Sequence, residues 1–287
     1  MRSTVFNLVF KSYCLVTLVV ALPLTLLPRR TGAAWILRTW ARGVLALMRT
    51  VAGIRVEVRG REHIPADRPV VFAGKHQSEA DGIVVLALVP NLAVVAMREL
   101  ARIPLAGRLL RKLEMILVDT GGGAGQRATL VDGSRAVHGQ GRSILIYPEG
   151  TLMAVGTRER YRAGVYHVAR DLGTVVVPIA TNMGLSWDRR KARKRPGTVV
   201  VEFLPPMEPG PDKAAFMARL EAAIETRSDD LAAEGRKVNG RRTGANAALP
   251  VAAPARRIVR RRPSSSAPRR PALSATPPSS DGPSPAP

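Results

Sequence analysis

Apolar residues follow two different patterns on either side of residue 53. Residues 5–27 are almost continuously apolar, and residues 33–51 carry a broad apolar face with arginines off it. From residue 54 on, short apolar runs of strand length alternate with segments of helical periodicity. Alternating strands and helices are typical of an α/β protein with a largely parallel sheet. The pattern therefore predicts an α/β fold preceded by a pair of N-terminal helices.

The expected elements follow from these periodicities. Strands are predicted at 54–58, 69–73, 92–97, 115–118, 143–147, 174–179 and 198–204, and helices at 79–89, 104–113, 126–138, 163–171 and 212–234. The predicted fold class is a mixed, largely parallel sheet flanked by helices. In such sheets ligands bind beyond the carboxyl ends of the strands, so polar residues at those ends are the candidates for chemistry.

The first apolar segment ends at Pro28, and two arginines follow. Its uninterrupted part, 14–27, is short for a full membrane span and contains Pro23, which would kink it. A signal peptide would have a similar apolar segment, but no convincing small-residue cleavage site follows. We therefore predict an uncleaved anchor. Residues 33–51, with Trp35 and Trp40, form a basic amphipathic helix suited to a membrane interface or, alternatively, a core helix. We predict that residues 1–51 are membrane-anchoring helices.

The charge and the composition of the chain limit the classes of partner that it is expected to bind. The chain has 287 residues, 44 Lys and Arg against 22 Asp and Glu, and a net charge of +22. Such an excess attracts nucleic acid, an anionic membrane or phosphorylated substrates. Aromatic residues make up only 4%, which argues against a base-stacking surface. The single cysteine, Cys14, excludes an intramolecular disulfide.

The C-terminal segment differs from the rest in composition. From Arg241 onward nine arginines and one acid stand among Pro, Ser and Ala, without apolar periodicity. This composition predicts a disordered basic tail over 237–287, either attracted to anionic lipid or simply solvated. The predicted domains are therefore 1–51, an α/β domain over 52–236, and the tail.

The stretch with the clearest chemistry is 76–81, between the strand 69–73 and the following helix. His76 lies on the strand-to-helix turn, and Asp81 can fold back to accept from one ring nitrogen, leaving the other as a base. These are two members of a Ser-His-Asp arrangement in which the substrate would supply the hydroxyl. On six residues alone, the favoured explanation is a histidine and a helix-capping acid that merely lie close in sequence.

A second turn strengthens the first. Tyr147-Pro148-Glu149-Gly150-Thr151 follows the strand at 143–147, so Glu149 is expected at the same sheet edge as His76. Glycine there permits close approach of the backbone. Two such turns on one edge favour a functional site over coincidence.

These blocks, in this order and spacing, resemble the glycerolipid acyltransferases, in particular bacterial 1-acyl-sn-glycerol-3-phosphate acyltransferases. The resemblance rests on His76-x-x-x-x-Asp81 and Pro148-Glu149-Gly150-Thr151, together with blocks at 98–119 and 177–180, and covers about residues 35–234. It implies acyl transfer from acyl-CoA or acyl carrier protein to the sn-2 hydroxyl of lysophosphatidic acid, giving phosphatidic acid. No cofactor or metal and no acyl-enzyme are implied.

The resemblance also implies roles for individual residues. His76 would be the general base and Asp81 its orienting partner. The acceptor would be held by Arg98, Glu149, Gly150, Thr151 and Arg162, and Pro178 would shape the acyl-donor pocket. The expected partners are the lipid substrate, the acyl carrier and an anionic membrane surface, with no specific nucleic acid. The expected location is the inner membrane, with the catalytic domain on its cytoplasmic face.

Two departures bear on the acceptor. Leu152 and Thr120 stand where the family commonly has arginines near the acceptor phosphate, and Lys75 replaces a frequent asparagine. Arg98 or an arginine at 158, 160 or 162 would then compensate. Alternatively, the acceptor is another lysolipid, such as a lyso-ornithine lipid, or the chain is a non-catalytic basic protein that binds membranes or nucleic acid.

Other patterns are weaker. The glycine-rich stretch 121–125 lacks dinucleotide-loop spacing and is expected to be a flexible loop. The remaining histidines are at 63, 138 and 167, and nothing in the sequence has metal-ligand spacing. The basic run 189–195 is expected to be a membrane or donor-phosphate contact, or a solvated loop.

Overall fold

The computed structural model describes residues 1–119, 124–188 and 193–242. In this part of the chain the strands form one seven-stranded sheet in the order β1-β7-β6-β2-β5-β3-β4. The strands are β1 (Ile54–Arg59), β2 (Val71–Gly74), β3 (Leu92–Met97), β4 (Ile116–Val118), β5 (Ser143–Ile146), β6 (Val176–Thr181) and β7 (Gly197–Phe203). All predicted strands are therefore present, with ends shifted by one or two residues.

Strand direction confirms a mixed, largely parallel sheet. Only β6 and β7 pair antiparallel among the described strands, and every other pairing is parallel. Periodicity along the sequence could not show this reversal, because an apolar strand looks the same in either direction.

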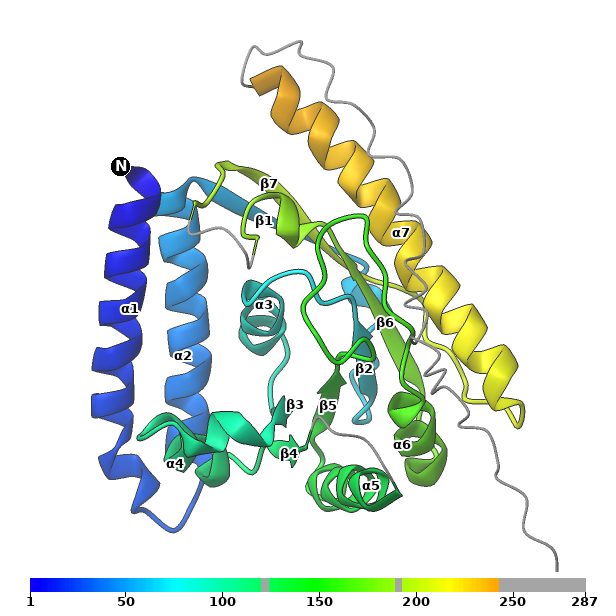
Figure 1. The fold of residues 1–287 in the computed structure, drawn as a ribbon. Helices are drawn as coiled ribbons and strands as arrows, with labels where there is room; N and C mark the ends of the chain where they lie inside the picture. The colour runs from blue at the N-terminus through cyan, green and yellow to red at the C-terminus, as the bar shows by residue number, and fades with distance from the viewer. Residues whose placement is uncertain (120–123, 189–192, 243–287) are drawn as a thin grey trace, which may run out of the picture. The chain divides into compact units, whose positions relative to one another are not determined.

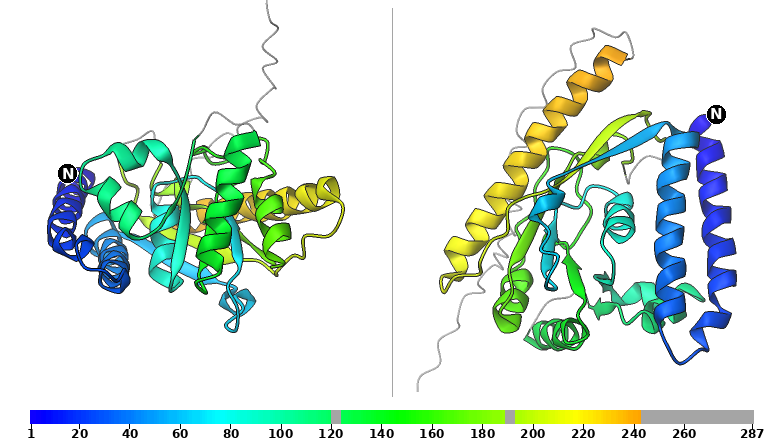
Figure 2. Two further views of the ribbon diagram at one scale, coloured as in Figure 1. Left: turned by 90° about the horizontal axis from the view of Figure 1, so that it is seen from below. Right: turned by 180° about the vertical axis from the view of Figure 1, so that it is seen from behind.

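The helices cover the two faces of the sheet (Figures 1 and 2). Helices α2 and α3 lie on one face, with α1 packed against α2, whereas α5, α6 and α7 lie on the other face. Their bounds are α1 (Arg2–Ala21), α2 (Thr31–Leu47), α3 (Ala80–Leu88), α4 (Ala106–Lys112), α5 (Ala124–His138), α6 (Gly164–Leu172) and α7 (Lys213–Arg242). Short 3₁₀ turns at Arg61–His63, Arg98–Arg102 and Met183–Leu185 were not predicted.

Strand β2 holds the centre of the sheet. Every residue from Val71 to Gly74 is buried, which explains the unbroken apolar run, since a strand covered on both faces has no solvated side. It pairs with β5 through Ala73 and Ile146, so the two strands end side by side. The next residues along each strand are therefore brought together at one edge.

Helix α1 is apolar and mostly exposed. Among the described residues it is the one helix long and apolar enough to cross a membrane. Its exposed apolar side chains continue into the following segment: Val5, Leu8, Val9, Leu15, Val16, Val19, Val20, Leu26, Leu27 and Trp35. Near its start, Phe6 and Phe10 pack edge-on against buried Trp187, which joins α1 to the segment after β6.

Three predictions fall partly or wholly on residues outside the described part. These are the glycine-rich loop, the basic run 189–195 and most of the tail. Helix α7 continues to Arg242, beyond the predicted tail start at 237. Residues 237–242 therefore belong to a helix rather than to an irregular tail.

Candidate active site

The two turns singled out in the sequence meet at the carboxyl ends of β2 and β5. The turn 75–79 joins β2 to α3, and the turn 147–151 follows β5. Both peptide groups of His76 are held: its N–H donates to Glu149 Oε2 (3.1 Å), and its carbonyl accepts from Met153 N–H (2.7 Å). The backbone that carries His76 is thus fixed from the neighbouring loop.

Asp81 folds back onto the turn as expected. Its Oδ2 lies 3.3 Å from His76 Nδ1 and accepts the backbone N–H groups of Gln77 and Ser78 at 2.7 Å each. The Asp81 side chain is 4% exposed, whereas that of His76 is 22% exposed. An imidazole protonated on Nδ1 donates to Asp81 and keeps a lone pair on Nε2. That arrangement suits a general base.

Tyr147 orients the imidazole from one face. Its ring stacks on that of His76 with centroids 3.9 Å apart and planes 14° from parallel. Burial, and then the charge of Asp81, raise the pKa of Tyr147 well above its usual value, so the phenol stays protonated. Gly74 allows this approach, because a Cβ there would come within 3.0 Å of the Tyr147 ring. The histidine is therefore fixed by a carboxylate at its edge and by a ring on its face.

Glu149 faces inward. Its Oε1 accepts from Lys75 Nζ at 2.7 Å, and its side chain is fully buried. Burial raises the pKa of Glu149, and Lys75 partly offsets that effect. Both carboxylate oxygens therefore bind groups of the chain itself, and a direct contact with the acceptor stays a prediction.

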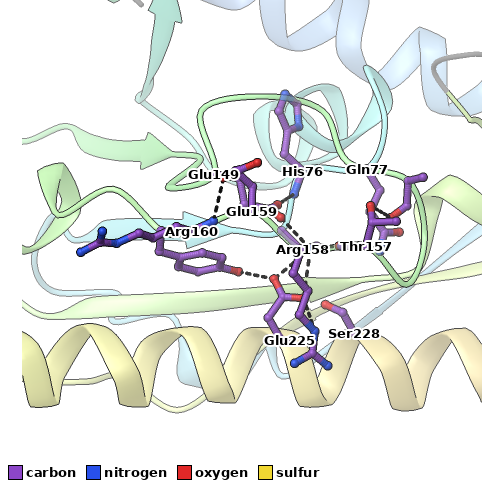
Figure 3. Close-up of polar contacts among 12 residues, drawn as sticks. His76, Gln77, Glu149, Thr157, Arg158, Glu159, Arg160, Glu225 and Ser228 are labelled. Atoms are coloured by element: carbon purple, nitrogen blue, oxygen red, sulfur yellow. Dashed lines mark hydrogen bonds and ion pairs between the residues drawn. The ribbon is translucent and has the colours of Figure 1, made fainter. Parts of the chain in front are cut away.

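A buried polar cluster behind the turn was not predicted (Figure 3). Lys75 Nζ also contacts both oxygens of Glu225 on α7 (2.8 and 3.0 Å) and the carbonyl of Thr157 (2.9 Å). Tyr161 donates its hydroxyl to Glu225 at 2.8 Å. The His76 ring points away from Glu225 and α7, so this cluster lies behind the catalytic turn.

Two of the predicted acceptor residues, Gly150 and Arg162, lie against one another. Gly150 has a positive φ of 67°, and a Cβ there would come within 2.9 Å of the guanidinium of Arg162. Thr151 and Arg162 are exposed. Arg98 is also exposed and pairs with Asp119 (2.8 Å). Arg162 therefore lies against the second turn, whereas Arg98 is engaged elsewhere.

Pro178 lies in β6, where it pairs with Ala73 of β2, and it is buried. It lines a cavity of about 520 Å³ together with Leu204, Pro205, Met207 and residues of the helix α7. Neither His76 nor Asp81 lines this cavity. Pro178 thus lies on the strand next to β2 but lines a cavity separate from the His76 turn.

In the described part of the chain, no group of three His, Cys, Asp or Glu side chains is positioned to hold a metal ion.

Comparison with known proteins agrees with this geometry. The profile of the family described as Acyltransferase matches residues 55–182. A 1-acyl-sn-glycerol-3-phosphate acyltransferase of Pseudomonas aeruginosa is 32% identical over 209 residues, covering 73% of this chain and 81% of that protein. The chain belongs to the acyltransferase family. The human 1-acyl-sn-glycerol-3-phosphate acyltransferase alpha is 27% identical over 201 residues, covering 68% of this chain and 71% of that protein.

The fold is also known from a solved acyltransferase. The crystal structure of the 1-acyl-sn-glycerophosphate (LPA) acyltransferase from Thermotoga maritima matches with a TM-score of 0.66 at 20% identity, covering 80% of this chain and 98% of that one. This match shows a shared fold. The profile match includes both turns of the acyltransferase site but ends before α7.

Proposed function

We propose that this acyltransferase moves a fatty acyl group from a thioester donor to the sn-2 hydroxyl of 1-acylglycerol 3-phosphate, giving phosphatidic acid. The proposal is carried by one observation: a half-buried imidazole, His76, whose Nδ1 faces a buried carboxylate and whose ring reaches solvent. The relatives that carry the name 1-acyl-sn-glycerol-3-phosphate acyltransferase support the choice of acceptor.

In the proposed reaction His76 Nε2 takes the proton from the acceptor hydroxyl as its oxygen attacks the thioester carbonyl carbon. Asp81 stabilises the imidazolium that forms. The tetrahedral oxyanion then collapses, the C–S bond breaks, and the imidazolium returns the proton to the leaving thiolate. General base catalysis of this kind contributes about 10²–10⁴-fold, and holding the two substrates together adds more.

The donor is proposed to be acyl-CoA or acyl carrier protein, acting as co-substrate. Because a thioester is already activated, the reaction needs no further cofactor and no acyl-enzyme. Pro178, next to the catalytic strand, is proposed to shape the donor side of the site.

The acceptor phosphate is proposed to bind at Arg162. Leu152 stands where the family usually has an arginine. The guanidinium of Arg162 lies against Gly150, which precedes Leu152 by two residues. The Arg162 side chain is exposed, so its guanidinium is accessible to an anion. Guanidinium groups bind phosphate through paired N–H donors. Gly150 and Thr151 would complete this site, with Glu149 supporting the turn from its buried side, whereas Arg98 would first have to leave its pair with Asp119.

The enzyme is proposed to work on the inner membrane with its catalytic domain on the cytoplasmic face. Helix α1 presents apolar side chains outward, and the net charge of +22 favours an anionic surface. A lipid acceptor and a water-soluble donor would then meet at the membrane–water interface.

Another lysolipid, such as a lyso-ornithine lipid, is the second candidate acceptor. It is favoured by the replacement of two expected arginines by Leu152 and Thr120. A non-catalytic role is disfavoured, because the His76–Asp81 pair is assembled.

Membranes containing the protein should be supplied with labelled acyl-CoA or acyl carrier protein and a panel of lysolipids. Product with lysophosphatidate, absent for His76→Ala, supports the proposal. Product with a different lysolipid alone would replace the acceptor, and no product from any pair would refute catalysis. Arg162→Gln should raise the KM for lysophosphatidate about tenfold without lowering kcat, whereas Arg219→Gln, at an exposed arginine of α7, serves as the matched control.

A further inference from the structure

Lys75 is a buried cation whose three N–H donors are all used. Its ammonium contacts Glu149, Glu225 and the carbonyl of Thr157 within 3.0 Å, and the residue is 2% exposed. An ammonium has three donors and no acceptor, so these partners saturate it. Lys75 therefore has no capacity left to bind a substrate directly.

The contacts of Lys75 run from α7 to the catalytic turn. Glu225 lies on α7, and Lys75 connects it to Glu149, whose second oxygen accepts the N–H of His76. Lys75 is also the residue that directly precedes His76 in the chain. The catalytic backbone is thus linked to α7 both through a peptide bond and through a hydrogen-bonded carboxylate.

The charges in this cluster are unequal. One buried ammonium serves two buried carboxylates, and a second cation nearby, Arg158, is exposed and 3.5 Å from Glu225. Removing the ammonium would leave two buried carboxylates facing one another, which is strongly unfavourable. Removing the charge of Glu225 would leave a neutral pair of Lys75 and Glu149. Substitution of Lys75 is therefore expected to lower stability and activity much more than substitution of Glu225.

We propose that Lys75 and Glu225 are positioning residues for acyl transfer, which hold Glu149 against the His76 N–H and so fix the catalytic turn from helix α7. The inference deepens the proposed function and rests on it. It extends the active-site support to a helix outside the matched family region, and it gives a role to the lysine that stands in place of the common asparagine. A buried ion pair alone is weak evidence for stability, so its placement behind His76 carries the argument.

The effect of pH on the cluster of Lys75, Glu149 and Glu225 depends on the charged groups around it. The charged and titratable groups around Lys75 and Glu225 come from the turn after β5, the segment 151–162, α7 and α3; they are Glu149, Arg158, Tyr161, Glu221, Asp229 and Asp81. Of these, Asp229 is paired with Arg158. Glu149 and Glu225 are the carboxylates that contact Lys75, so they lose their counter-charge when the ammonium is removed.

The test compares Lys75→Met, Glu225→Gln and the double variant in the full-length protein. In Lys75→Met, kcat should fall about 10- to 100-fold with little change in KM, because the catalytic turn shifts while the predicted acceptor residues do not. Without the ammonium, both carboxylates acquire raised pKa values in the folded state. Stability and kcat should then decline as pH rises through those values.

Glu225→Gln supplies the internal rescue. Alone it should lower kcat only a few-fold, because the amide oxygen still accepts from Lys75 or Tyr161. In the double variant one carboxylate is gone, so kcat should recover in part and the pH dependence of the melting temperature should flatten. Glu62→Gln, at an exposed acid of the turn Arg61–His63 outside this cluster, is the matched control and should match the wild type.

The possible outcomes separate the two proposals. An inactive wild type would refute the proposed function, whereas the pH slope of the melting temperature would still report on the cluster. An active wild type with unchanged kcat in Lys75→Met, or a double variant no better than that single one, would overturn the positioning role. If Lys75→Met does not fold, Glu225→Ala replaces it, and an unchanged kcat there has the same meaning.

Discussion

Asp81 and Glu149 both place a buried carboxylate against the turn that carries His76, but they reach it from different directions. Asp81 comes from the first turn of α3 and touches the ring as well as two backbone N–H groups. Glu149 comes from the end of β5 and touches the backbone N–H of His76 and the ammonium of Lys75. One carboxylate acts on the imidazole, and the other acts on the chain that holds it.

The difference shows how a single histidine can be fixed at two levels. A contact with the ring selects its tautomer and stabilises its charge, so its loss should act on the chemical step. A contact with the backbone sets where the ring stands, so its loss should act through geometry. Graded substitutions can separate these contributions.

The largest expected effect sets the scale for the comparison. His76→Ala should abolish measurable turnover, because it removes the base that both carboxylates serve, a loss of about 10²–10⁴-fold or more. The side chain is partly exposed, so the melting temperature should change little. Thermal unfolding followed beside the acyl-transfer assay checks both expectations. A large loss of stability would instead make His76 a core residue.

Asp81→Asn should have the next largest effect. The amide is nearly isosteric but uncharged, so the imidazolium loses its counter-charge and the Nδ1–H tautomer is no longer favoured. We expect kcat to fall about 10²–10³-fold with KM nearly unchanged. Steady-state kinetics with lysophosphatidate measure the split. A rise in KM at constant kcat would show that Asp81 serves binding rather than the base.

Glu149→Gln should cost less, about tenfold in kcat, because Glu225 still holds Lys75 and the amide oxygen can accept from His76 N–H. Burial raises the pKa of Glu149 above its unfolded value, so this group favours folding most at low pH. Its contribution declines as pH rises through the folded pKa. The variant should therefore show a flatter dependence of unfolding free energy on pH in the mildly acidic range, measured by urea titration. A loss equal to that of Asp81→Asn would place Glu149 on the reacting groups.

The same contrast explains how far the sequence could predict the site. His76 and Asp81 are five residues apart, so a strand-to-helix turn suffices to join them, and the turn at 147–151 follows because parallel strands end at one edge. The strands were predicted from local periodicity, and the largely parallel sheet from their alternation with helices.

Nothing in the sequence indicated the side-chain contacts between residues far apart in the chain. Glu225 lies 150 residues from Lys75, on a helix whose periodicity marks it only as one of many polar positions. Lys75 was visible as a departure from the family pattern, but its burial and its partners depend on how α7 packs on the sheet. The inward direction of the Glu149 side chain depends on that cluster, so the sequence could not predict it either.

Tyr147→Phe should have the smallest effect, and it tests whether the ring of Tyr147 works through its face alone. Phenylalanine keeps the stack on His76 and removes a hydroxyl that is buried without a hydrogen-bond partner among the described residues. Removing an unsatisfied buried hydroxyl relieves a desolvation cost, so the melting temperature should stay constant or rise slightly. With the stack intact, kcat should fall by less than about threefold, because the ring still fixes the imidazole plane. Tyr147→Leu, which removes the aromatic face, should lower kcat more. Equal losses in both variants, compared at matched pH, would assign the effect to the hydroxyl. Tyr147 lines the same small cavity as Asp81, so it would then be a third polar support of His76 and Asp81.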